Sequence, residues 1–363
     1  MRPRLVTELV VGTDVGVQVR MPEDKLFATR LVSVGVIFLA ALVLAACGGS
    51  GGYSGSAQGD VAAVDPPSND PGTTAVDITN AIFTEDSADC AVYVNSYAAS
   101  VLDITRALGF ESAITISADD SLCTLSSDNI PNHDFNDNTA NFATQVSEVA
   151  QSFSISRAPA VAAAVTPLAQ QTWDAVMLNG VVLDLLSAGC YRPNEPNADL
   201  NGNVAIGCNV QDDWLLDPLG TEGGFGVDMH NAHVQPNGAY HYHGNPGAMF
   251  DENYGPTGSP VIGFAADGFP IYGSYFLDIA SGFIRKAISG YRLKPGNRPV
   301  SATDPGGAYD GTYIDDYEFL GDQDLDECNG MTVDGQYGYY VTDDYPWVLG
   351  CHSGTVDASF SKN

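Results

Sequence analysis

The sequence predicts a mainly β protein, with a single β-sandwich-like domain, long loops and a few short helices. Three observations support this prediction. Several short segments alternate apolar and polar residues, as strands with one buried face do. The turn dipeptides Asn179-Gly180 and Asp267-Gly268 interrupt apolar runs, as they do in β-hairpins. The 39 glycines and 20 prolines among 363 residues suit a fold rich in turns and loops.

Residues 1–46 are expected to be a secretory signal peptide, with Met21 as a candidate for the true start. The apolar run from Leu31 to Ala46 follows basic residues and is short for a membrane span. It ends in Leu44-Ala45-Ala46-Cys47, which resembles the lipoprotein box of bacteria. The resemblance implies cleavage before Cys47, acylation of its sulfur and anchoring in a lipid bilayer. We expect an outer-membrane lipoprotein that faces the periplasm or the cell surface; the alternative is an ordinary secretory signal.

Residues 47–78 are expected to be a disordered tether, because they are rich in Gly, Ser, Pro and Asp. The composition shows no further linker after residue 80, so residues 79–363 are expected to form one β-rich domain.

The strand signals follow one another along this domain. They lie in residues 112–125 with a polar turn at 118–121, in 146–155, in 175–184 and in 261–272. The first, third and fourth of these stretches predict hairpins. Helix signals are few, and the best candidates are residues 90–108 and 160–170.

Six cysteines remain when Cys47 is set aside: Cys90, Cys123, Cys190, Cys208, Cys328 and Cys351. Export to an oxidising compartment favours three disulfides. Six cysteines allow 15 connectivities, of which pairing between neighbours along the chain is the simplest. Metal ligation by thiolates is the alternative, although no Cys-x-x-Cys pair occurs.

The charge balance is strongly acidic, with 14 Lys and Arg against 45 Asp and Glu and a net charge of −31. Such a surface repels phosphate backbones, so we expect no nucleic-acid partner. It also attracts cations.

The histidines are clustered, since four of the six lie between His230 and His243. His241 and His243 are two residues apart, so on a strand they point to the same side with Cα atoms about 6–7 Å apart. Turn residues at 236–238 predict a hairpin that brings an upstream segment alongside. The candidate metal ligands in the two arms are Asp228, His230, His233, His241 and His243.

Imidazoles with a carboxylate suit Zn(II) or Cu(II), and copper has the higher affinity at nitrogen-rich sites. Two alternatives remain open, a structural hydrogen-bond network and a catalytic histidine that needs no metal. His133 and His352 could join the cluster through folding.

Four stretches resemble the signature motifs of the YHYH-domain proteins, which are exported bacterial proteins. These stretches are residues 228–243, 263–273, 325–330 and 341–351. The resemblance covers residues 170–354 strongly and 85–170 less so, and it implies no particular activity because the family is named for a motif. Many members carry a second Tyr-His-Tyr-His. Here Gly335–Tyr340 takes its place, matches Gly238–His243 at three of six positions and lacks both histidines.

A calcium loop is a second possible ion site. Asn197, Asp199 and Asn201 precede Gly202 with the spacing of the first half of such a loop, but Cys208 stands where the loop needs Glu. The alternative is a solvated loop.

The expected function is therefore binding of a divalent metal, Cu or Zn, by an exported lipoprotein domain. A metal-dependent hydrolase or oxidase, and a calcium-stabilised adhesion or glycan-binding module, are the alternatives. The sequence leaves enzymatic activity and any protein or glycan partner open, and it contains no His-Glu-x-x-His motif and no phosphate loop.

Overall fold

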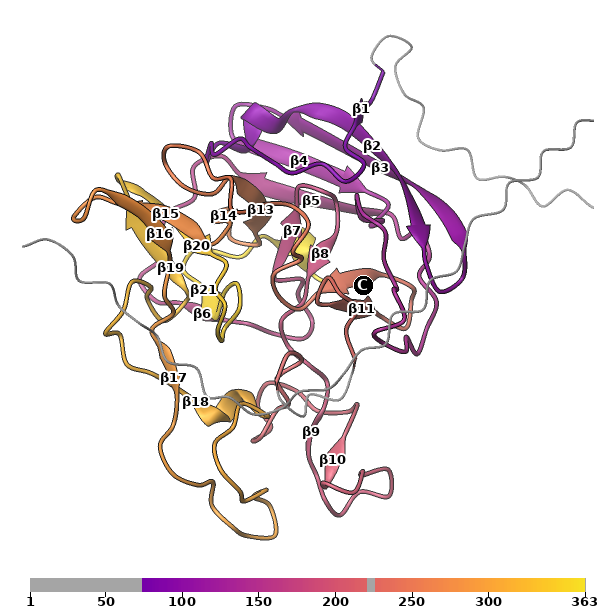
Figure 1. Ribbon diagram of the computed structural model, residues 1–363, viewed down its shortest axis with the longest axis vertical. Helices are drawn as coiled ribbons and strands as arrows, with labels where there is room; N and C mark the ends of the chain where they lie inside the picture. The colour runs from indigo at the N-terminus through magenta and orange to yellow at the C-terminus, as the bar shows by residue number, and fades with distance from the viewer. Residues whose placement is uncertain (1–73, 221–225, 363) are drawn as a thin grey trace, which may run out of the picture. The chain divides into compact units, whose positions relative to one another are not determined.

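The computed structural model describes residues 74–220 and 226–362 (Figure 1). The expected signal peptide, Cys47 and most of the expected tether lie outside the described residues. The described part is mainly β and contains several sheets, which confirms the predicted fold class. Its only helical segments are three short 3-10 turns: η1 (Cys90–Tyr93), η2 (Ile314–Asp316) and η3 (Ala358–Phe360). None of its helices is long and apolar enough to cross a bilayer.

The first sheet has five strands in chain order. They are β1 (Val76–Asp77), β2 (Asn95–Asp103), β3 (Leu108–Ala118), β4 (Leu122–Ser127) and β5 (Gln151–Ser156). The pairing of β3 with β4 confirms the hairpin predicted at 112–125. On β3, Ile114 and Ile116 are buried and their neighbours Ala113, Thr115 and Ser117 are exposed, so one face of this sheet packs on the core.

The second sheet has eight strands in the order β11-β12-β8-β7-β13-β14-β20-β19. Their bounds are β7 (Ala175–Met177), β8 (Val182–Leu183), β11 (Ala232–Val234), β12 (Tyr240–Tyr242), β13 (Val261–Ala265), β14 (Pro270–Tyr272), β19 (Gly330–Val333) and β20 (Gln336–Tyr340). The hairpins β7/β8 and β13/β14 confirm the turns predicted at Asn179-Gly180 and Asp267-Gly268.

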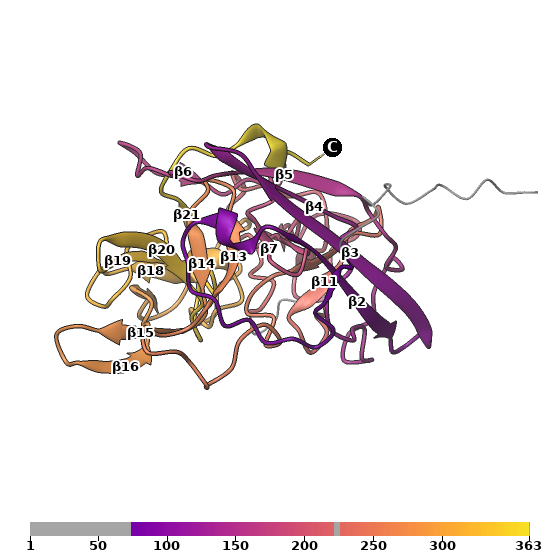
Figure 2. The same cartoon turned by 90° about the horizontal axis from the view of Figure 1, so that it is seen from above.

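The two sheets share one hydrophobic core, as a sandwich does. Figure 2 shows β2–β5 lying over the middle of the second sheet, near β7 and β13. Gly180 lies where the two layers approach each other closely. Its φ is +83°, and a Cβ there would lie 2.7 Å from Ser127 Cβ and 2.8 Å from Ile114 Cγ1. Only glycine fits this turn without displacing the opposite sheet.

The eight-stranded sheet consists of two half-sheets with the same connectivity. The first half-sheet is β11-β12-β8-β7 and the second is β19-β20-β14-β13, and β7 pairs with β13 where they meet. In each half, one parallel pair joins two hairpins: β12 with β8, and β20 with β14. The registers place Tyr242 opposite Leu183 and Tyr339 opposite Ile271, so the halves correspond residue by residue.

Side-chain contacts repeat in the two half-sheets as well. Asp228 accepts a hydrogen bond from the Tyr240 hydroxyl at 2.8 Å, and Asp326 accepts one from the Tyr337 hydroxyl at 2.9 Å. In both cases the carboxylate also caps the turn that leads into the outer strand. The weak repeat seen in the sequence is therefore a repeat of the fold.

Small two-stranded ribbons accompany the two large sheets. Three of them lie in the chain segments inserted within the half-sheets, and the fourth pairs β21 with β6. They are β9 (Cys190–Tyr191) with β10 (Asn203–Val204), β15 (Tyr275–Asp278) with β16 (Phe283–Lys286), β17 (Tyr291–Leu293) with β18 (Tyr317–Phe319), and β21 (Cys351–His352) with β6 (Thr166–Pro167). The disulfides are Cys90–Cys123, Cys190–Cys208 and Cys328–Cys351, which confirms pairing between neighbours along the chain.

Both predicted helices are wrong. Residues 90–108 form the turn η1 and then strand β2, in which Ala99, Val101 and Asp103 alternate inward with the period of a strand. Residues 160–170 are irregular except for the two-residue strand β6, which pairs with β21. In both stretches, strand pairing decides the conformation over local helix propensity: β2 pairs with β1 and β3, and β6 pairs with β21.

Candidate metal centre

The β-hairpin of β11 and β12 carries the histidine cluster. His233 on β11 lies directly opposite His241 on β12, and His243 follows the end of β12. This pairing confirms the predicted hairpin. Strand alternation sends Tyr240 and Tyr242 to the opposite side, where both pack against the ring of His133.

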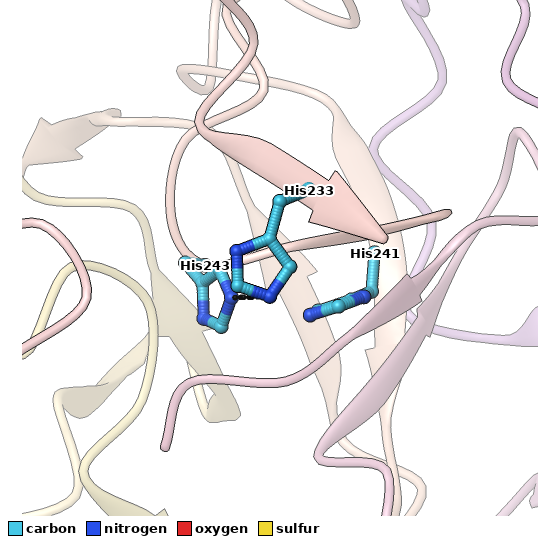
Figure 3. A group of neighbouring side chains, drawn as sticks. All are labelled: His233, His241 and His243. Carbon is cyan, nitrogen blue, oxygen red and sulfur yellow. Dashed lines mark hydrogen bonds between the residues drawn. The ribbon is translucent and has the colours of Figure 1, made fainter. Parts of the chain in front are cut away.

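Three imidazoles converge on one point: those of His233, His241 and His243 (Figure 3). One ring nitrogen from each lies within 4.8 Å of the other two, and the Nε2 atoms of His233 and His243 are 3.2 Å apart. Two nitrogens bound at about 2.0–2.1 Å to one tetrahedral zinc ion would lie about 3.3–3.4 Å apart. The separation of the His233 and His243 nitrogens is thus close to that of two ligands of one ion.

His241 has a ring nitrogen available for such an ion. Its Nδ1 donates a hydrogen bond to the Ala239 carbonyl at 3.2 Å, which leaves the lone pair on Nε2. This Nε2 is buried and has no hydrogen-bond partner within residues 74–220 and 226–362. A buried polar atom without a partner is costly, and a metal ion would satisfy it.

The three imidazoles are neutral at pH 7. Burial, and next the nearby His241, lowers the pKa of His233 to about 3. Burial also lowers the pKa of His241 to about 3. The pKa of His243 lies well below its ordinary value because of burial and the neighbouring His233. Imidazole binds metals in its neutral form, so no proton has to leave at pH 7.

A cavity of about 380 Å³ opens beside the three histidines. Much of its lining is apolar and includes Phe142, Leu186, Ile206 and Val234. An ion pair forms part of the wall: Lys362 Nζ lies 2.6 Å from the Asp184 carboxylate. Gln235 donates a second hydrogen bond to the same oxygen of Asp184 at 2.8 Å.

The other two candidate ligands lie outside the converging group. Asp228 accepts hydrogen bonds from the Tyr240 hydroxyl and from the backbone of Asn136 and His230. His230 Nδ1 donates to the Pro246 carbonyl at 2.7 Å, and its ring contacts that of His133 in a tilted arrangement, with 3.7 Å between centroids and 35° between the ring planes. These contacts engage both side chains outside the converging group.

The remaining histidines are also engaged elsewhere. His133 contacts the Tyr242 hydroxyl through Nε2 at 2.7 Å, and His352 Nε2 donates to the Asp174 carbonyl at 3.0 Å. Two further groupings with ligand-type spacing contain Cys90–Cys123 or Cys190–Cys208, whose sulfurs are joined in disulfides and are not thiolates.

The proposed calcium loop is a tight turn in which Asp199 is the central residue. Its Oδ1 accepts hydrogen bonds from the backbone N–H groups of Asn201 and Asn203, both at 2.8 Å. Asn197 is exposed. These contacts are those of a capped turn, and the calcium prediction stays a prediction.

Two members of the cavity wall were not apparent from the sequence. Asp184 closes the hairpin predicted at 175–184, so its place beside β12 follows once β8 is known to pair with β12. Lys362 lies 178 residues further along the chain, and no sequence signal connects the two.

The geometry can be set beside known proteins. The model of a family described as "YHYH protein" matches residues 152–354, which is more than half of the chain. The chain belongs to the YHYH protein family. The match includes the whole eight-stranded sheet and the three histidines of this YHYH protein, whereas β1–β4 precede it. No curated protein and no solved structure matches the chain.

The second half-sheet of this YHYH protein can be compared with the first, which carries the three histidines. In the second half-sheet, the three positions that correspond to the histidines hold other side chains: Met331, Gly338 and Tyr340. Strand pairing and the Asp–Tyr contacts are nevertheless the same in both halves. This half-sheet topology therefore also forms where the three positions hold no histidine.

Proposed function

We propose that this YHYH protein binds one divalent zinc or copper ion through His233, His241 and His243. The convergence of three neutral imidazoles on one point carries the proposal. Three nitrogen donors suit both ions, and at equal availability copper binds more tightly. The net charge of −31 attracts cations to the protein.

A purely structural hydrogen-bond network explains the cluster less well. Such a network pairs its buried nitrogens. His233 and His243 share a hydrogen bond between their Nε2 atoms, but Nε2 of His241 is buried without a partner among the described residues. The second half-sheet also reaches the same backbone pairing without these histidines. A metal ion accounts for both observations.

We further propose that the protein acts outside the cytoplasm, tethered to the outer membrane through an acylated Cys47. Three disulfides support this proposal, because disulfides form and persist in oxidising compartments.

Metal stoichiometry tests the proposed site. The purified protein is stripped with chelator, loaded with zinc or copper and dialysed, and its metal content is measured by elemental analysis. We expect about one ion per chain, and loss of that ion in His241→Ala and His243→Ala. The matched control is His230→Ala, from the same stretch but outside the converging group, which should keep the ion. Absence of metal from the unaltered protein, or equal retention by all three variants, would overturn the proposal.

A further inference from the structure

We infer that the metal site is hydrolytic: a zinc ion held there keeps one coordination position open to the cavity, where small neutral carboxylic esters are cleaved. This inference rests on the proposed function and adds to it a reaction and a substrate class.

The open position follows from the number of ligands. Structural zinc sites are closed by four protein ligands, whereas catalytic sites have three and leave the fourth position to water or substrate. Within residues 74–220 and 226–362, the converging group contains three histidines and no carboxylate or thiolate. Asp184, the carboxylate in the cavity wall, is held by Lys362 and Gln235.

The position of the cavity supports access of a substrate. All three histidines belong to its lining, so an ion between them faces the open volume. A volume of about 380 Å³ lies in the range of roughly 300–1,000 Å³ that is typical of small-molecule sites.

The lining and the charge of the protein select the substrate class. Phe142, Leu186 and Ile206 offer apolar contacts to an acyl or alcohol group. The net charge of −31 disfavours approach of phosphate esters and other multiply charged anions. A neutral ester with a small apolar part satisfies both conditions.

The reaction needs no redox partner. Zinc makes its bound water available as hydroxide near neutral pH. The hydroxide oxygen forms a bond to the ester carbonyl carbon, and the bond from that carbon to the alcohol oxygen breaks. The departing alkoxide would take its proton from the water that next binds the zinc, which restores the hydroxide, and would leave as the alcohol. The acid product would release its proton to solvent and leave as a carboxylate. One water is consumed for each ester cleaved.

The test uses the full protein and the neutral ester 4-nitrophenyl acetate, with 4-nitrophenyl phosphate as the charged comparison. We expect zinc loading to raise the rate of acetate hydrolysis at least about tenfold over the zinc-free protein, with no comparable gain for the phosphate. His243→Ala should lose this gain and His230→Ala should keep it. Equal hydrolysis of both esters would overturn the substrate class.

Two further measurements separate this inference from metal binding itself. Ala205 is exposed and lines the cavity, so Ala205→Trp should keep the zinc but raise KM for the acetate at least about tenfold. Azide added to the cobalt-loaded protein should change its visible spectrum, because azide enters an open position. Protein that binds one zinc ion but shows neither the azide response nor zinc-dependent hydrolysis would overturn the inference and leave the proposed function standing. Protein that binds no zinc would overturn both.

Discussion

Tyr242 stabilises the first half-sheet through a buried hydrogen-bond relay. Asn179 Nδ2 donates to the Tyr242 hydroxyl at 2.9 Å, and this hydroxyl donates to His133 Nε2 at 2.7 Å. His133 Nδ1 donates to the Asp134 carbonyl, so Nε2 carries the lone pair that the hydroxyl needs. Tyr242, Asn179 and His133 are all buried.

The substitution Tyr242→Phe removes one oxygen, which leaves His133 Nε2 without this partner and leaves Asn179 Nδ2 with its other hydrogen bond, to Asn132 Oδ1 at 3.1 Å. One buried polar atom that loses its partner costs about 1–3 kcal/mol, so we expect the free energy of unfolding to fall by about 1–3 kcal/mol. The tyrosine ring faces away from the three histidines, so zinc stoichiometry should stay at one ion per chain.

Urea denaturation of the metal-free, oxidised protein measures this loss. The midpoint should fall at unchanged m-value, and Tyr254→Phe, at an exposed position, should shift the free energy by less than about 0.5 kcal/mol. A Tyr242→Phe protein as stable as the unaltered one would refute the relay. Loss of zinc from this variant would refute the division of roles between tyrosines and histidines.

Two further predictions concern stability. Burial raises the pKa of Asp217 from 3.8 to about 6, so the folded state binds the additional proton and stability falls as pH rises from about 4 to about 6. The stability difference between the unaltered protein and Asp217→Asn should therefore fall by about 2 kcal/mol between pH 4 and 7, as measured by urea titrations at each pH, and a flat difference would contradict it. Gly180→Ala should lower the free energy of unfolding by more than about 1 kcal/mol, because the new Cβ meets Ser127 and Ile114 at a positive φ. If Gly180→Ala unfolded thermally at the same midpoint as the unaltered protein, the two sheets would not be in contact at residue 180.

Local chemistry made much of the fold predictable. Asn179-Gly180 and Asp267-Gly268 define their hairpins because both dipeptides suit tight turns, and the structure has both. The spacing of His241 and His243 predicted a shared side of a strand, and the turn at 236–238 predicted the partner strand that carries His233.

Contacts between residues far apart in the sequence could not be predicted in this way. The side chains of Asp228 and His230 have the right spacing for ligands, but their hydrogen bonds to Tyr240 and Pro246 direct them away from the converging group. Lys362 reaches Asp184 only through the tertiary fold. The correspondence of the half-sheets depends on strand register, which three matching residues in six do not reveal.

X-ray absorption spectroscopy at the zinc edge of the zinc-loaded protein tests the metal centre most directly. The three converging imidazoles predict three nitrogen scatterers at about 2.0–2.1 Å with the outer-shell signal of imidazole rings, and one further oxygen at a similar distance. A first shell that contains sulfur, or one made of oxygens without imidazole scattering, would contradict the assignment of His233, His241 and His243 as the ligands.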